Sequence, residues 1–182
     1  LSFFARVRIR GGNQGDTSTS ASGVSAPRVG VTYEGFTVAV GNINGALEST
    51  PVLYSGAVGL TGLGCSNLPL NHSSAGAFAW DSFSSAGAGS NGIEVIYSSN
   101  GFGVHLSDSG SAAGGTADRT AAHVSYAFGD WTVALGHQSS DVAGEDATLL
   151  TVGGKLGSVN VGLAHADNEG DRDATRINAS FD

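Results

Sequence analysis

The stretch IEVIYSSNGFGVHLS, residues 93–107, alternates apolar and polar side chains on both sides of an Asn-Gly pair. One side of the two runs is apolar and carries Ile93, Val95, Tyr97, Phe102, Val104 and Leu106. Period-two alternation is typical of antiparallel strands whose two faces meet different surroundings. Asn-Gly supplies the positive φ angles that a tight hairpin requires. The stretch therefore predicts a hairpin with one apolar and one polar face.

The same alternation recurs along the chain in both directions. It is clearest in RVGVTY (28–33), FTVAVG (36–41), AHVSYAF (122–128), WTVALGHQ (131–138), VNVGLA (159–164) and ATRINASFD (174–182). Helix signals are nearly missing, because glycine occurs 29 times and no long stripe of apolar residues has helical spacing. We therefore predict an all-β protein of about ten antiparallel strands.

The connections between these runs differ in length in a regular way. Short turns are expected at 34–35, 99–101, 129–130 and 156–158, and longer polar links at 11–27, 108–118, 140–146 and 167–173. Tight turns at one end and long loops at the other are typical of a transmembrane β-barrel inserted from one side. Aromatic residues flank the tight turns on the apolar face, as expected of a belt at the membrane boundary: Tyr33, Phe36, Tyr97, Phe102, Tyr126, Phe128 and Trp131.

The run FARVRIR, residues 4–10, indicates which face meets water. Three of the eight basic residues of the chain alternate there with Ala5, Val7 and Ile9. An arginine facing lipid at the middle of the membrane costs about 2–4 kcal/mol. The sequence therefore predicts that the arginine face borders a water-filled lumen and that the apolar face borders lipid.

Composition excludes several other classes of protein. The net charge of −8 argues against a nucleic-acid partner, which needs a basic surface. No run of about 18 apolar residues predicts a transmembrane helix, and the single cysteine, Cys65, has no internal partner for a disulfide. Both ends of the sequence lie in strand-like runs, so we expect an internal segment of a longer chain.

One connection is much longer than the others. About 50 residues, 42–92, separate FTVAVG from IEVIYS, and loops beyond about 15 residues are usually functional or disordered. This connection holds enough apolar residues to pack against another surface: Leu47, Leu53, Tyr54, Leu60, Leu63, Phe78, Trp80 and Phe83. We expect it to fold back against the inside wall of the barrel and to narrow the channel.

Four stretches carry a resemblance to a known family: FFARVRIRGG (3–12), FTVAVGNINGALES (36–49), VGLTGLG (58–64) and NGIEVIYSSNGFGVHLSDSG (91–110). The sequence resembles the bacterial outer-membrane general diffusion porins of the Rhodobacter type. The resemblance implies an antiparallel barrel of sixteen strands, usually a homotrimer, in the outer membrane of a Gram-negative bacterium. Residues 1–182 would be part of that barrel, and 42–92 its inward constriction loop. The implied function is passive diffusion of ions and small hydrophilic solutes, with outer-membrane lipid and lipopolysaccharide as neighbours.

The resemblance also implies a charged constriction, with acidic groups of the inward loop facing basic groups of the wall. On the wall it assigns Arg6, Arg8, Arg10 and Arg28 to the pore lining. In the loop the acids are few, Glu48 and Asp81, which departs from the expected acidic pattern and leaves ion selectivity open. Glu94 and His105 are expected to add to the lining, and His105 and His123 to be solvated histidines of the lumen.

One other function remains as an alternative. A soluble or surface-exposed β-sandwich that acts as a binding or adhesion module would show the same alternation, because the pattern does not distinguish lipid from a protein core. An enzyme is not supported, since the five histidines belong to no GxSxG, HExxH or P-loop motif. No cofactor is predicted. The acidic loops SDVAGED (140–146) and DNEGDRD (167–173) leave open a surface Ca²⁺ site bridging lipopolysaccharide, although both lack EF-hand spacing.

Overall fold

The computed structural model describes residues 1–7, 9–10, 23–24, 26–54, 69–70, 91–110, 118–170 and 172–181. The strands are Ser2–Arg6 (β1), Ile9–Arg10 (β2), Gly23–Val24 (β3), Arg28–Tyr33 (β4), Phe36–Gly41 (β5), Asn91–Ser99 (β6), Phe102–Gly110 (β7), Arg119–Phe128 (β8), Trp131–Ser140 (β9), Ala147–Leu156 (β10), Val159–Asn168 (β11) and Ala174–Phe181 (β12). No helix in these ranges is long and apolar enough to cross a membrane.

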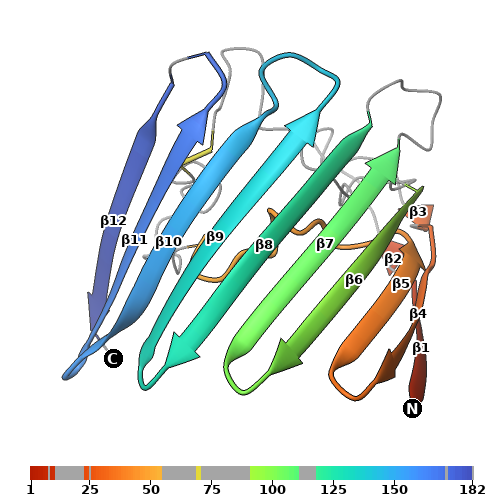
Figure 1. Ribbon diagram of the computed structural model, residues 1–182, viewed down its shortest axis with the longest axis horizontal. Helices are drawn as coiled ribbons and strands as arrows, with labels where there is room; N and C mark the ends of the chain where they lie inside the picture. The colour runs from red at the N-terminus through yellow and green to blue at the C-terminus, as the bar shows by residue number, and fades with distance from the viewer. Residues whose placement is uncertain are drawn as a thin grey trace, which may run out of the picture.

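Ten of the strands form one antiparallel sheet in which each strand pairs with the next along the chain (Figure 1). The order is β1-β4-β5-β6-β7-β8-β9-β10-β11-β12, and β2 and β3 form a separate two-stranded ribbon. This up-and-down order is the simplest that hairpin connections allow, and it is the order of strands in a barrel wall. The predicted fold class, all-β with about ten antiparallel strands, is confirmed.

Tight turns and long loops lie at opposite ends of the sheet, as predicted (Figure 1). Tyr33 pairs with Phe36 across a two-residue turn, and Ser99 with Phe102 across the next one. The central residues of the first turn have φ angles of 45° and 85°, and those of the second 50° and 81°. Positive φ at both central positions defines the type I′ turn, whose twist matches that of the flanking strands.

The two faces of the sheet have opposite character. On one face, large apolar side chains are exposed; among them are Val29, Val38, Val40, Ile93, Leu106, Val124, Leu135 and Ile177. On the other face, polar side chains are buried, including Glu94, His105, Ser107, His123, Gln138, Thr151 and Asn168. A soluble sandwich has the reverse arrangement, with its apolar face inside. The exposed apolar face is the one predicted to contact lipid.

Aromatic rings gather at the tight-turn end of the apolar face. The rings of Phe36 and Tyr97, on neighbouring strands, have centroids 4.3 Å apart. Tyr126 and Phe128 stack at 6.0 Å, and both are about half exposed. Amphipathic rings at one height suit the boundary between hydrocarbon and water. The aromatic residues therefore lie where the predicted belt places them.

The connection after β5 covers the polar face. Residues 42–54 run behind the sheet in Figure 1, and their apolar side chains join a buried cluster with small wall residues. The cluster consists of Ala46, Leu47, Leu53, Leu70, Ala121, Ala147, Leu149, Ala164 and Ala166. Leu149 is a large, fully buried apolar residue on the face that carries the buried polar side chains, and its neighbour Leu150 is exposed on the opposite face. The covering segment explains this break in the alternation of β10.

A charge on the apolar face should therefore destabilise the protein in a membrane. Leu135, in the middle of β9, is 51% exposed on that face. We expect Leu135→Arg to lower the free energy of unfolding by about 2–4 kcal/mol in lipid vesicles, as is typical at the bilayer midplane. Ser125→Arg on the opposite face of β8 is the control. Equal losses for the two variants, measured by denaturant unfolding, would contradict this assignment of faces.

Candidate functional site

The segment 42–54 leaves the sheet at a glycine. Gly41, the last residue of β5, has a φ angle of 96°, and a Cβ at this position would lie only 2.2 Å from the carbonyl oxygen of Pro27. The next residue, Asn42, donates its backbone N–H to that same oxygen at 2.9 Å. A side chain is therefore excluded at Gly41. This turn directs the chain onto the polar face of the wall.

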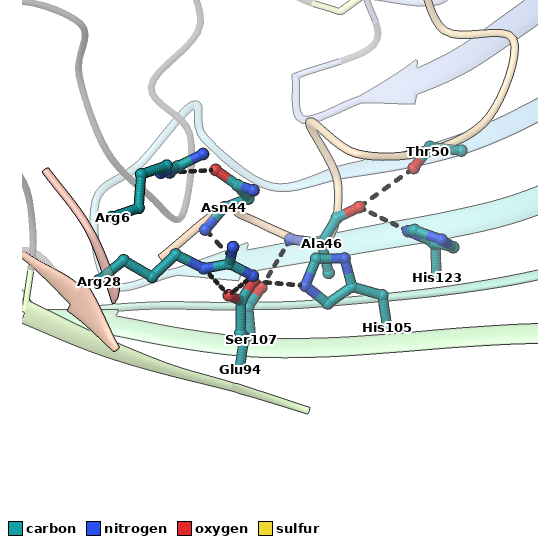
Figure 2. A network of polar contacts seen from close by, with 9 residues as sticks. All are labelled: Arg6, Arg28, Asn44, Ala46, Thr50, Glu94, His105, Ser107 and His123. Atoms are coloured by element: carbon teal, nitrogen blue, oxygen red, sulfur yellow. Dashed lines mark hydrogen bonds and ion pairs between the residues drawn. The ribbon is translucent and has the colours of Figure 1, made fainter. Parts of the chain in front are cut away.

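The wall then binds both backbone groups of Ala46 (Figure 2). The N–H of Ala46 donates to Ser107 Oγ on β7 at 2.7 Å, and its carbonyl accepts from His123 Nδ1 on β8 at 2.6 Å. Thr50 Oγ1 also donates to this carbonyl, at 3.4 Å. Buried backbone groups need partners, and here two neighbouring strands supply them from their side chains.

A carboxylate lies at the centre of the polar network in Figure 2. Glu94 on β6 is 1% exposed and pairs with Arg28 on β4 through Oε1. Its other oxygen accepts from His105 Nε2 at 3.0 Å and from the backbone N–H of Asn44 at 3.2 Å. The guanidinium of Arg28 also lies over the ring of Phe4, 4.9 Å from its centroid. A buried carboxylate is tolerated only when paired and hydrogen-bonded in this way.

Arg6 on β1 binds the segment through a side-chain amide. Its Nη2 donates to Asn44 Oδ1 at 2.9 Å. Arg6 lies directly opposite Arg28 in the β1–β4 pairing, and like charges at that spacing repel each other. Glu94 compensates the charge of Arg28, which reduces this repulsion.

The contacts continue across the wall to β12. Thr151 Oγ1 on β10 donates to the carbonyl of Pro51 at 2.7 Å, and Asn168 Nδ2 on β11 donates to the carbonyl of Pro69 at 3.1 Å. Arg176 on β12 donates to the carbonyls of Val52 and Leu53, with Nη2 2.7 Å from the first. Wall side chains on β6, β7, β8, β10, β11 and β12 therefore contact the same connection.

The structure brings together four of the residues predicted from sequence: Arg6, Arg28, Glu94 and His105. Glu48 is half-buried on the segment and accepts a 3.4 Å hydrogen bond from the Tyr54 hydroxyl. Arg10 lies in β2, but its side chain is outside the described residues, as are Arg8 and Asp81 entirely. The partner of Arg28 is a wall carboxylate, whereas the sequence suggested a loop acid.

The expectation of solvated lumen histidines is wrong for two of them. His105 and His123 are 4% and 7% exposed, because the segment covers them. Their rings meet edge to face with centroids 5.4 Å apart. Alternation placed both correctly on the polar face, but the path of the covering segment has no signature in the strands. For the same reason the sequence did not indicate Ser107, Thr151, Asn168 or Arg176 as contacts of that segment.

The sheet is one layer thick. One of its faces is apolar and exposed, and a segment of the chain crosses the other, polar face. This arrangement is that of a β-barrel channel wall. The chain matches the sequence model of the Gram-negative porin family over residues 1–181. It belongs to that family. No curated protein sequence matches it.

A solved porin structure shares the fold. A triple mutant of Rhodopseudomonas blastica porin is 21% identical, with a TM-score of 0.54, over 98% of this chain and 74% of that chain. A double mutant of the same porin is 20% identical, with a TM-score of 0.46, over 98% of this chain and 79% of that one. The protein is thus an outer-membrane porin that forms a channel for small solutes, and the β-sandwich alternative is not favoured.

The buried pair of Arg28 and Glu94 should be strongly coupled. Removing one partner of a buried ion pair costs about 3–5 kcal/mol because the other charge stays buried. We therefore expect Glu94→Gln to lower the free energy of unfolding by about that amount, and the double variant with Arg28→Met to cost less than the two single changes added together. Unfolding of all three variants by denaturant completes the double-mutant cycle.

A second pair serves as the control for this cycle. Arg119 and Glu145 are in contact at 2.7 Å, but their side chains are 17% and 15% exposed, against 12% and 0% for Arg28 and Glu94, so their coupling should be the smaller of the two. Additive costs for Arg28→Met and Glu94→Gln would show that the network in Figure 2 is not a buried ion pair in the folded protein.

Proposed function

We propose that residues 42–92 form the constriction of the channel. What supports this is the series of hydrogen bonds that side chains of five wall strands, β6, β7, β8, β10 and β12, make to residues 44–53. A segment held against the inside of a channel wall occupies part of its cross-section. Transport through such a channel is passive and needs no catalytic residue: aperture and lining charge select the solutes.

We further propose that Arg6 contributes positive charge to the constriction, because it binds Asn44 of the segment at 2.9 Å. The charge of Arg28 is paired with the buried carboxylate of Glu94. Glu48, half-buried on the segment itself, supplies the opposing negative charge. Glu94 and His105 belong to the predicted lining, and their burial gives them the role of holding the segment to the wall.

Excision of the segment tests the constriction. Gly41 and Gly92 are cross-strand partners in the β5–β6 pairing, so a short Asn-Gly turn can join the two strands in place of residues 42–91. We expect the shortened porin to admit larger sugars in liposome swelling and to show a higher single-channel conductance in planar bilayers.

Excision at another loop provides the control. Ser109 and Arg119 are partners in the β7–β8 pairing, so the connection 111–117 can be shortened in the same way. That variant should keep the original size limit. An unaltered size limit after loss of 42–91 would place the constriction elsewhere.

We also propose that β4 and β5 face a second copy of this chain, as in a homotrimer. Each of these strands has six residues, whereas β6 to β11 have nine or ten. Six residues rise about 20 Å along the strand, and the usual tilt reduces this below the apolar band of about 25 Å. Their outward side chains also border a shallow apolar depression lined by Phe3, Val29, Val31, Val38 and Val40. A protein neighbour covers such a short wall better than lipid does.

A bulky substitution distinguishes a protein neighbour from lipid. Val38→Trp in β5 should prevent trimer formation, because a packed interface tolerates added volume poorly, whereas fluid lipid adapts to it. Val124→Trp, at an outward position 45% exposed on β8, should leave the oligomer intact. Unheated gel electrophoresis and chemical cross-linking measure the result. A trimer that survives Val38→Trp but not Val124→Trp would move the interface to the other strands.

Lipopolysaccharide contact and Ca²⁺ at the acidic loops remain predictions. The described residues contain no group of three or more His, Cys, Asp or Glu that could hold a metal ion. In the loop after β9, burial acts to raise the pKa of Glu145, but hydrogen bonds from Arg119 and Ser140 and the charge of Arg119 hold it below its usual value. Asp146 accepts from the Ser140 N–H at 2.7 Å. A cation would have to share these carboxylates with protein donors.

A further inference from the structure

The turn that ends the described part of the segment has an unusual backbone conformation. Val52 has a φ angle of 65°, in the left-handed region that β-branched residues rarely adopt. Such a conformation persists only where the surroundings impose it. Val52 therefore requires an explanation from its contacts with the wall.

Three consecutive carbonyls of this turn accept hydrogen bonds from wall side chains. Thr151 donates to Pro51, and Arg176 donates to Val52 through Nη2 and to Leu53 through Nη1. Thr151 and Arg176 lie in one row across the sheet, with Ala164 between them, because Ala164 pairs with both. The small side chain of Ala164 leaves space for the turn, which lies between its hydrogen-bond donors Thr151 and Arg176.

The side chain of Val52 also has a matching place on the wall. A Cβ at Gly153, two residues after Thr151 on β10, would lie 2.7 Å and 2.9 Å from the two methyl groups of Val52. Only glycine allows this approach. Packing on Gly153 and the two bonds from Arg176 together fix the turn in its left-handed conformation.

Arg176 has no carboxylate partner among the residues that the structure describes, although its guanidinium is half-buried. Its two terminal nitrogens are bound to backbone carbonyls, and its Nε has no hydrogen-bond partner there. An arginine that serves as a lining charge would point into water. The two terminal nitrogens of Arg176 instead bind two adjacent carbonyls. The planar guanidinium group of arginine matches this geometry, and the ammonium group of lysine does not.

We propose that Arg176 is a positioning residue of the channel: it holds the strained turn at Val52 against β10 and β12 and thereby sets the aperture. This role rests on the proposed constriction by residues 42–92. Loss of the two bonds would free the carbonyls of Val52 and Leu53, and the strain at Val52 would drive the turn away from the wall.

We call the two hydrogen bonds from Arg176 to the turn at Val52 the clamp. The mobility of a nitroxide label tests the clamp separately from its effect on the aperture. A spin label at Ser49→Cys, in a Cys65→Ser background of the whole protein, lies on an exposed position of the segment. Arg176→Met should increase the mobility of this label and the fluctuations of the single-channel current. Arg176→Lys should fall between Arg176→Met and the unchanged arginine, because one ammonium cannot span both carbonyls. If Arg176→Met does not fold, the lysine variant carries the same test.

A matched variant separates the clamp from the general loss of an inward arginine. Arg119→Met removes an inward arginine whose partner is Glu145, and it should leave the label unaffected. A label equally immobile in Arg176→Met and in the unchanged protein would overturn the clamp. A mobile label with an unaltered current would support the clamp and contradict the constriction by 42–92.

Discussion

A wall one strand thick has to satisfy two surroundings at once, and every other feature of this porin depends on that constraint. In a two-layer protein the apolar side chains of one sheet find partners on another. Here ten of the described strands form a single layer, so the apolar half of each of them stays exposed. The polar half cannot pack as a dry core. Its buried members keep their hydrogen bonds because the chain itself crosses over them.

The crossing segment resolves a conflict between polarity and burial. Glu94, His105 and His123 would be hydrated in an open lumen, and a purely apolar cover would leave them without partners at a high free-energy cost. Residues 44–46 instead offer backbone N–H and C=O groups, which match the acceptors and donors of the wall. Leu47 and Leu53 pack over alanines of neighbouring strands. The covering segment therefore supplies both the polar partners and the apolar contacts of the lumen side.

Alternation in the sequence was sufficient to predict the strands, their two faces and the tight turns, because each of these depends on neighbours two or three positions away. The β10 strand was the least regular, since Leu149 and Leu150 are both apolar and only the covering segment makes the inward one favourable. The ion pair of Arg28 with Glu94 joins residues 66 positions apart. It depends on the pairing of β4, β5 and β6, which period-two patterns leave undetermined. Arg6 and Arg28 thus lie on the predicted face, while their partners required the three-dimensional register.

The spread of the donors along the chain has a consequence for the order of assembly. The segment is made before its partners: Ser107 follows Ala46 by 61 positions, His123 by 77, and Arg176 follows Val52 by 124. These bonds cannot form until the later strands have paired, and closing such long loops is slow. The passage should therefore be wide while the wall inserts, and its narrowing should be a late step of maturation.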